Sequence, residues 1–173
     1  MSESTNVLVV DDDEVVRLSY QRSLRGAHCN VEAAFNGEDA LNALQHKNFD
    51  VVLLDLRMPG MDGMSVLKEI KRSWPESEVV VITGYPTVET AKEAVRLGAY
   101  DYLAKPVGPA EIINAASGAM TQKQWALHRE LSSLDAGSTC WTEMHRRWLA
   151  GPSPDAGSDA TINHRAGAGN LAS

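Results

Sequence analysis

The residue best placed to do chemistry in this chain is Asp55. It directly follows the apolar run 51–54, and it precedes a turn-forming segment that contains Pro59 and Gly60. A carboxylate at the carboxyl end of a buried strand lies where open α/β sheets bind their ligands. Asp55 is therefore a candidate nucleophile or metal ligand.

Three further apolar runs, 6–10, 79–82 and 100–104, also end in polar residues. The residues that follow them are Asp11, Asp12 and Asp13; Thr83; and Lys105. Because the carboxyl ends of parallel strands meet at one edge of a sheet, we expect carboxylates, a hydroxyl and an ammonium group to share one site. Asp13 is expected to cap the next helix and not to bind a ligand.

Such a site suits a divalent cation and a phosphoryl group. Adjacent carboxylates, here Asp11, Asp12 and Asp55, repel one another, and a hard cation such as Mg²⁺ relieves that repulsion because it prefers oxygen ligands. A nucleophilic carboxylate can accept a phosphoryl group and become an aspartyl phosphate. The metal and the compact charge of Lys105 would then neutralise the phosphoryl oxygens, and Thr83 would donate its hydroxyl to one of them.

The elements that position these residues follow from alternating apolar runs and helical patterns. We expect strands at 6–10, 29–33, 50–54, 78–82 and 100–104, and helices at 14–25, from 36, at 64–70, at 86–97 and from 109. This alternation predicts a doubly wound, five-stranded parallel sheet with five helices. Val15, Leu18 and Leu24 are the apolar positions of the first helix, which Gly26 should close, and Gly98 should adopt a left-handed conformation.

The chain changes character after Met120. Residues 5–121 hold the predicted α/β domain, 122–150 a helical extension with a further helix at 139–149, and 151–173 a tail rich in small and polar residues. The tail lacks apolar periodicity, so we expect it to be disordered.

The extension has two interpretations. A seven-residue spacing joins Ile113, Met120, Leu127 and Leu134. That spacing is typical of a seam between two helices, so the last helix and its extension either form a homodimer or pack on their own domain. The same choice applies to three large apolar side chains, Trp125, Trp141 and Trp148, for which we favour packing back onto the domain.

The composition limits the classes of function. The formal net charge is −7, which argues against a chain that coats nucleic acid or anionic membranes. The amino terminus has no secretory signal pattern, and no apolar stretch approaches the length of a membrane span. Cys29 and Cys140 form no metal-binding spacing. We therefore expect a cytoplasmic protein without a membrane partner.

Together these segments resemble the receiver domain of bacterial two-component response regulators over residues 5–121. The segments that carry the resemblance are Val9-Val10-Asp11-Asp12, Asp55 with Met58-Pro59-Gly60-Met61-Asp62-Gly63, Thr83-Gly84 and Lys105-Pro106. The resemblance implies the flavodoxin-like receiver fold. The sequence from Thr83 to Ala91 is similar to receivers that precede enhancer-binding transcription activators.

The resemblance implies roles for individual residues. Asp55 would be the phosphoacceptor; Asp12, Asp55 and the main-chain carbonyl of Arg57 would bind Mg²⁺ directly, and Asp11 largely through water. Thr83 and Lys105 would contact the phosphoryl group. Thr83 and Tyr102 would form the conformational switch.

Two further expectations come from the same resemblance. The peptide bond before Pro106 should be cis. Arg57 and Tyr85 lie two residues after the phosphoacceptor and the switch threonine, and we hypothesise that these bulky side chains slow the loss of phosphate by screening the attacking water.

Several functions remain open. The favoured one is a response regulator that receives phosphate from a sensor histidine kinase and acts on an effector by protein contact. Alternatives are a phosphorelay intermediate that passes phosphate to a histidine phosphotransfer protein, and a transcription regulator whose output region is missing. DNA binding is not predicted for this chain, because basic and acidic side chains balance after residue 120. A phosphohydrolase is disfavoured because Arg57 stands where that class has its second acid, so we expect catalysis only of the chain's own phosphorylation and dephosphorylation.

Overall fold

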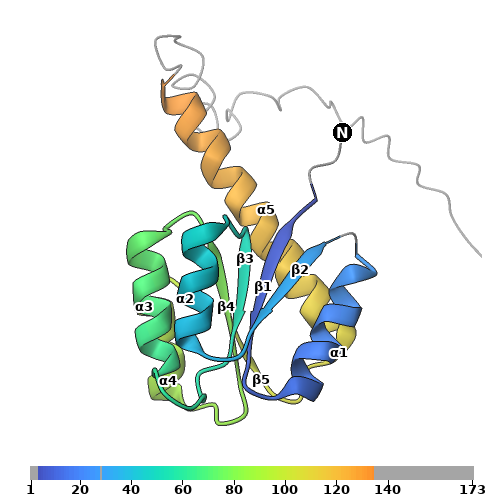
Figure 1. Ribbon diagram of the computed structural model, residues 1–173. Coiled ribbons are helices and arrows are strands. Elements are labelled where there is room, and N and C mark those ends of the chain that lie inside the picture. Colours follow the sequence, from blue (N-terminus) through green and yellow to red (C-terminus); the bar gives the residue numbers. More distant parts are fainter. Residues whose placement is uncertain (1–3, 28, 135–173) are drawn as a thin grey trace, which may run out of the picture. The chain divides into compact units, whose positions relative to one another are not determined.

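The computed structural model describes residues 4–27 and 29–134, which alternate between strands and helices (Figure 1). The strands are β1 (Asn6–Val10), β2 (Asn30–Ala34), β3 (Val51–Leu54), β4 (Glu78–Thr83) and β5 (Asp101–Ala104). The helices are α1 (Glu14–Arg25), α2 (Gly37–His46), α3 (Gly63–Ser73), α4 (Val88–Arg96) and α5 (Pro109–Leu134). The predicted helix at 139–149, Trp141, Trp148 and the predicted disordered tail lie outside the described residues.

All five strands are parallel and lie in the order β2-β1-β3-β4-β5. Val9 of β1, for example, pairs with Ala33 of β2 on one side and with Leu53 of β3 on the other. The predicted doubly wound, five-stranded parallel sheet with five helices is thus confirmed.

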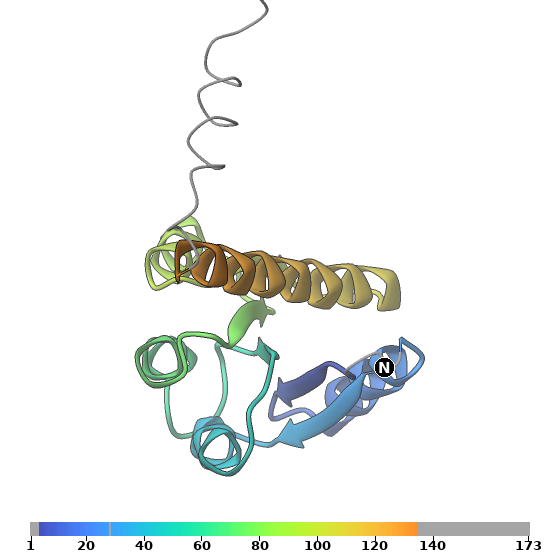
Figure 2. The ribbon, with the colours of Figure 1, turned by 90° about the horizontal axis from the view of Figure 1, so that it is seen from above.

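Helices cover both faces of this sheet. Val7 and Val9 of β1 pack with residues of α1 and α5, whereas Leu8 and Val10 pack with residues of α2, α3 and α4. Figure 2 shows α5 on one side of the strands and α2 and α3 on the other. Because both faces are covered, β3 and β4 are apolar at consecutive positions, as is typical of parallel strands, and every residue of these two strands is buried.

Polar side chains begin four of the helices. Asp13 caps α1, Asn36 caps α2, Asp62 caps α3 and Thr87 caps α4, each by accepting hydrogen bonds from main-chain N–H groups of the first turn. These N–H groups have no partner within their helix. The expected capping role of Asp13 is confirmed.

The side of α1 that packs on the sheet agrees only in part with the apolar positions expected from its sequence. Arg17, Tyr20 and Leu24 are buried, whereas Val15 and Leu18 are 75% and 56% exposed. Leu24 therefore lies on the buried side, as its apolar character suggests, whereas the expectation was wrong for Val15 and Leu18, because aliphatic character alone does not identify the side of this helix that packs on the sheet.

Several boundaries also differ by one or two residues from those expected. β2 begins at Asn30, β5 at Asp101 and α4 at Val88. Gly98 has the expected left-handed φ of 92°. Gly26 ends α1 in a right-handed conformation, with φ −62°, so the left-handed turn that often closes a helix is not formed there.

Helix α5 is continuous past residue 121 to Leu134. It packs on the sheet through Ile112, Ala115, Ala116 and Ala119, and Met120 joins the same cluster. Trp125 is 67% exposed, so the expectation that it packs back onto the domain is wrong. Within the described part of the chain, no helix combines the length and apolar character of a membrane span.

Candidate functional site

The predicted site residues meet at the carboxyl edge of the sheet. Asp11 follows β1 and Asp55 follows β3, and these neighbouring strands are the point where the strand order reverses. Open α/β sheets bind ligands in the crevice at such a switch point. A main-chain hydrogen bond from Asp55 N to the carbonyl of Val10, 2.9 Å long, fixes the end of β3 against the end of β1.

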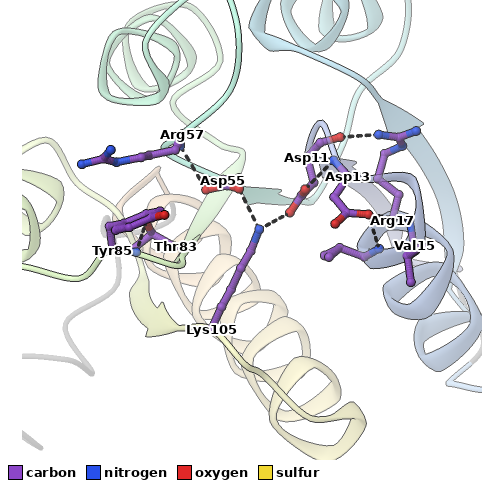
Figure 3. Close-up of polar contacts among 10 residues, drawn as sticks. Asp11, Asp13, Val15, Arg17, Asp55, Arg57, Thr83, Tyr85 and Lys105 are labelled. Carbon is purple, nitrogen blue, oxygen red and sulfur yellow. Dashed lines mark hydrogen bonds and ion pairs between the residues drawn. The ribbon is translucent and has the colours of Figure 1, made fainter.

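Lys105 joins the two buried carboxylates (Figure 3). Its Nζ lies 2.6 Å from Asp11 Oδ2 and 2.7 Å from Asp55 Oδ2. The side chains of Asp11 and Asp55 are 3% and 6% exposed, and that of Lys105 is 20% exposed. One ammonium group therefore neutralises part of the charge of two carboxylates that water barely reaches.

The second oxygen of each carboxylate is held by the main chain. Asp55 Oδ1 accepts a hydrogen bond of 3.0 Å from Arg57 N, and Asp11 Oδ1 accepts one of 2.9 Å from Asp13 N. Each carboxylate is thus fixed at both oxygens, one toward Lys105 and the other toward the loop that follows its strand. These contacts restrict the rotation of both carboxylates.

Three carboxylates could together hold a metal ion. One oxygen from each of Asp11, Asp12 and Asp55 lies within 4.8 Å of the others, with Asp12 exposed and the other two buried. A set of carboxylate oxygens open on one side fits Mg²⁺, which uses few protein oxygens and keeps several waters. Arg57, whose main-chain carbonyl is a predicted ligand, lies on the loop directly after Asp55.

The protonation states reflect this packing. Burial raises the pKa of the Asp11 carboxyl above its ordinary value, and hydrogen bonds from Lys105 and from the Asp13 N–H offset burial only in part. Burial would lower the pKa of Lys105, but its hydrogen bonds and attraction to Asp11 and Asp55 outweigh burial and raise this pKa. Lys105 is therefore a cation throughout the neutral range.

Thr83 and Tyr85 line the opposite side of the site. Thr83 is buried at the end of β4, and its Oγ1 accepts a hydrogen bond of 3.2 Å from Tyr85 N. The guanidinium carbon of Arg57 lies 4.3 Å from the centre of the Tyr85 ring. These three residues, with others from the loops after β3 and β4, line a groove of about 650 Å³.

Tyr102 and Pro106 lie on or after β5. The Tyr102 hydroxyl is 2.7 Å from the Thr90 hydroxyl on α4, so the predicted switch tyrosine is tied to the helix that begins beside the groove. Thr90 itself belongs to the capping box of that helix. The peptide bond between Lys105 and Pro106 is cis.

Two residues near the site were not singled out as functional from the sequence. Arg17 is buried and donates a hydrogen bond to the main-chain carbonyl of Asp11; its spacing from Tyr20 and Leu24 on one face of α1 could have revealed it. Gly63 lies so close to the loop after β3 that a Cβ there would clash with the Asp55 carbonyl oxygen, and its sequence signal was only that of a turn.

The chain is a doubly wound α/β domain with acidic residues and one lysine at its switch point. Comparison with known proteins identifies the class of protein that has this fold and site. The family of response regulator receiver domains matches residues 7–117, so this chain belongs to that family. The fold agrees with the structure of a response regulator receiver domain protein from Methanospirillum hungatei, with a TM-score of 0.70 and 24% identity, covering 72% of this chain and 99% of that one.

The sequence relatives are transcriptional regulators. The chain is 47% identical over 102 residues to the transcriptional regulatory protein ZraR of Salmonella typhimurium, which covers 59% of this chain and 23% of ZraR. It is 40% identical over 118 residues to the DNA-binding transcriptional regulator NtrC of Escherichia coli, covering 68% of this chain and 25% of NtrC. The chain thus matches about a quarter of the length of each relative. The resemblance to receivers of transcription regulators is confirmed.

Proposed function

We propose that Asp55 accepts a phosphoryl group from a sensor histidine kinase and that the chain acts as a two-component response regulator. The observation that carries this proposal is the contact of Lys105 with both Asp11 and Asp55, at 2.6 and 2.7 Å, in a site where three carboxylate oxygens converge. An aspartyl nucleophile, a fixed cation and an oxygen set for a divalent metal are the parts that phosphoryl transfer to a carboxylate requires.

The proposed reaction is a displacement at phosphorus. A carboxylate oxygen of Asp55 forms a bond to the phosphorus of a phosphohistidine, the P–N bond breaks, and its electron pair remains on the imidazole nitrogen of the kinase. Lys105 stabilises the charge on the phosphoryl oxygens, and the Thr83 hydroxyl donates a hydrogen bond to one of them. Water later attacks phosphorus and releases inorganic phosphate, which restores the Asp55 carboxylate.

Mg²⁺ is the proposed cofactor, held by Asp11, Asp12, Asp55 and the main-chain carbonyl of Arg57. When bound, it supplies positive charge against the phosphoryl oxygens. The residues of the chain would hold it through hard oxygen atoms only, a donor set that favours Mg²⁺ over softer transition metals. Asp12 is the exposed member of this set, and we propose that it receives the incoming ion.

The proposed kinase contact is the exposed side of α1. Val15 and Leu18, 75% and 56% exposed, lie on the helix that starts beside Asp11 and Asp12. A donor histidine must come within bonding distance of Asp55, so its protein must cover the rim of the site. An exposed aliphatic pair on the first turns of this helix suits a helical partner.

The output of the chain is proposed to be contact with an effector protein, and the chain is proposed to be cytoplasmic. Phosphate passed on from Asp55 would make it a phosphorelay member. The names of the relatives also support a longer transcription regulator, of which this receiver is one part. We propose no turnover of external substrates, because Arg57 occupies the position at which phosphohydrolases of this type carry an acid.

Intact mass after incubation with Mg²⁺ and acetyl phosphate tests the proposal. We expect one phosphate on the wild type and none on Asp55→Asn. Asp39→Asn, which changes an exposed carboxylate on α2, is the matched control and should be phosphorylated normally. A wild-type protein that gains no phosphate from acetyl phosphate or from a phosphorylated histidine kinase would refute the proposed function.

A further inference from the structure

Arg17 is a buried cation that pairs with no acidic side chain among the described residues. Arg17 is only 6% exposed. No carboxylate in the part of the chain that the structure describes forms an ion pair with its guanidinium. Burial of a charge is costly unless the charge is paired or hydrogen-bonded. Two contacts offset the free-energy cost of burying Arg17, one with a main-chain oxygen and one with an aromatic ring.

The main-chain contact is with Asp11. Arg17 NH1 lies 2.6 Å from the carbonyl oxygen of Asp11. Arg17 is in the first turn of α1, where its own N–H bonds to the Asp13 carbonyl, and helical side chains lean back toward the amino terminus. The guanidinium therefore reaches back past the helix cap to the end of β1.

This contact fixes the peptide group between Asp11 and Asp12. The peptide group is planar, so holding the Asp11 carbonyl oxygen also orients the nitrogen and Cα of Asp12. The N–H on the other side of Asp11 bonds to the Ala34 carbonyl at 3.3 Å. Asp12 is exposed, and this peptide is the link between its carboxylate and the buried part of the site.

The aromatic contact is with Phe35. The guanidinium carbon lies 4.3 Å from the centre of the Phe35 ring, although Phe35 itself is 59% exposed. A large apolar side chain with this exposure usually makes few packing contacts. The Phe35 ring, however, shields one face of the Arg17 guanidinium from water. A planar guanidinium both stacks and donates in its own plane, which a lysine ammonium does not.

We infer that Arg17 is a positioning residue for metal binding, which orients Asp12 through the Asp11 carbonyl while Phe35 keeps the guanidinium in place. This inference rests on the proposed Mg²⁺ site. Asp11 lies between two cations, Lys105 at its carboxylate and Arg17 at its carbonyl (Figure 3). Lys105 neutralises charge and contacts the carboxylates of Asp11 and Asp55, two of the proposed ligands, whereas Arg17 contacts the main chain of Asp11 and acts through it.

A competing effect has the opposite sign. A positive charge close to a divalent cation repels it, so removal of the Arg17 charge would strengthen Mg²⁺ binding if repulsion prevailed. Residues that orient metal ligands typically contribute ten- to a hundredfold to metal affinity. Because Arg17 acts on Asp12 through one peptide group, we expect the low end of that range, with weaker binding after its removal.

The test is a titration of the full chain with Mg²⁺, in which the amide NMR shifts of Asp12 and Asp55 report binding. Arg17→Met should weaken Mg²⁺ binding about tenfold. Arg17→Lys keeps the charge but has no planar face, and should weaken binding roughly threefold. Arg22→Met is the matched control, an exposed arginine on the same helix, and should bind Mg²⁺ as the wild type does.

Urea unfolding in the presence of EDTA separates positioning from stability. A purely structural Arg17 would lower the unfolding midpoint of both variants and leave the Kd for Mg²⁺ unchanged. Wild-type or tighter Mg²⁺ binding by a folded Arg17→Met overturns the inference; if that variant does not fold, wild-type affinity in Arg17→Lys overturns it. A wild-type chain without any Mg²⁺-dependent shift would instead refute the proposed function.

Discussion

Replacement of Lys105 by methionine should destabilise the fold strongly, although Lys105 lies in the proposed functional site. The side chain has a similar length and remains apolar along its stem, so the main loss is the ammonium group. Without it, no other cation in residues 4–27 and 29–134 pairs with the carboxylates of Asp11 and Asp55, which are 3% and 6% exposed. Removal of one partner of a buried ion pair typically costs about 3–5 kcal/mol.

We expect the lower end of that range, about 3 kcal/mol, because the Lys105 side chain is 20% exposed and some water reaches its charge. With a urea m-value of about 2 kcal/mol/M, the unfolding midpoint should fall by roughly 1.5 M. The assay is urea unfolding of the full chain at neutral pH in EDTA, followed by circular dichroism.

Lys47→Met is the matched control. Lys47 Nζ lies 2.6 Å from Glu32 Oε1, as close as the contacts of Lys105, but these side chains are 38% and 50% exposed. Exposed ion pairs contribute about 0–1 kcal/mol. If the two variants lost equal stability, burial of the carboxylates would not be the cause, and the reasoning would be wrong.

The pH dependence gives the same prediction a second test. The folded pKa of Lys105 is raised above 10.5, so its contribution to stability is complete below that pH and is lost as the pH rises through the raised pKa. The folded pKa of Asp11 is raised above 3.8, so stability falls as the pH rises through that window. Loss of Lys105 raises the pKa of Asp11 further. The difference in the free energy of unfolding between wild type and Lys105→Met should therefore be largest between neutral pH and pH 10, and it should shrink in acid.

Three further predictions concern the surroundings of the site. Gly118→Ala should destabilise the domain by about 1 kcal/mol instead of strengthening α5, because a Cβ there would lie 3.2 Å from Tyr100 Cζ and closer to its hydroxyl. In urea unfolding, the double variant with Tyr100→Phe should recover the lost stability, and no recovery would contradict this reasoning. Alanine at both Arg57 and Tyr85 should shorten the lifetime of phosphorylated protein roughly two- to fivefold, the equivalent of a lost cation–π contact; an unchanged lifetime would remove the screening hypothesis. Asp13→Ala should lower the free energy of unfolding by about 1 kcal/mol and Asp13→Asn by much less, so equal unfolding midpoints for the two would disprove the capping role.

The residues at the strand ends could be found from the sequence because two signals agreed. Asp55 and Lys105 each follow an apolar run, and a parallel sheet brings the ends of such runs to one edge. That argument needs only the order of the elements. Boundary errors at β2 and β5 did no harm, because β2 contributes no residue to the site and β5 ends at Ala104 as expected.

Arg17 and Gly118 show what the sequence could not provide. Arginine on a helix is usually solvated, and the contacts with Asp11 and Phe35 show what holds this one in a buried position. Glycine within a helix is usually a weakness, and only the position of Tyr100 shows why Gly118 is needed. The aromatic neighbours, Phe35 and Tyr100, lie outside the helix in question, so the local pattern could place Arg17 on one face with Tyr20 and Leu24 but could not show what either position contacts.

The arrangement of donors around Asp55 bears on how the site could accept phosphate. A carboxylate has about four acceptor positions, and Asp55 uses one toward Lys105 and one toward Arg57 N. It is therefore held in place while lone pairs remain for attack on phosphorus. Thr83 Oγ1 accepts from Tyr85 N, and this contact leaves the hydroxyl proton available to a phosphoryl oxygen. A phosphoryl group on Asp55 would thus meet donors already fixed by β4 and β5, and any movement of Thr83 toward it would lengthen the bond to Tyr85 and carry the change to the loop that precedes α4.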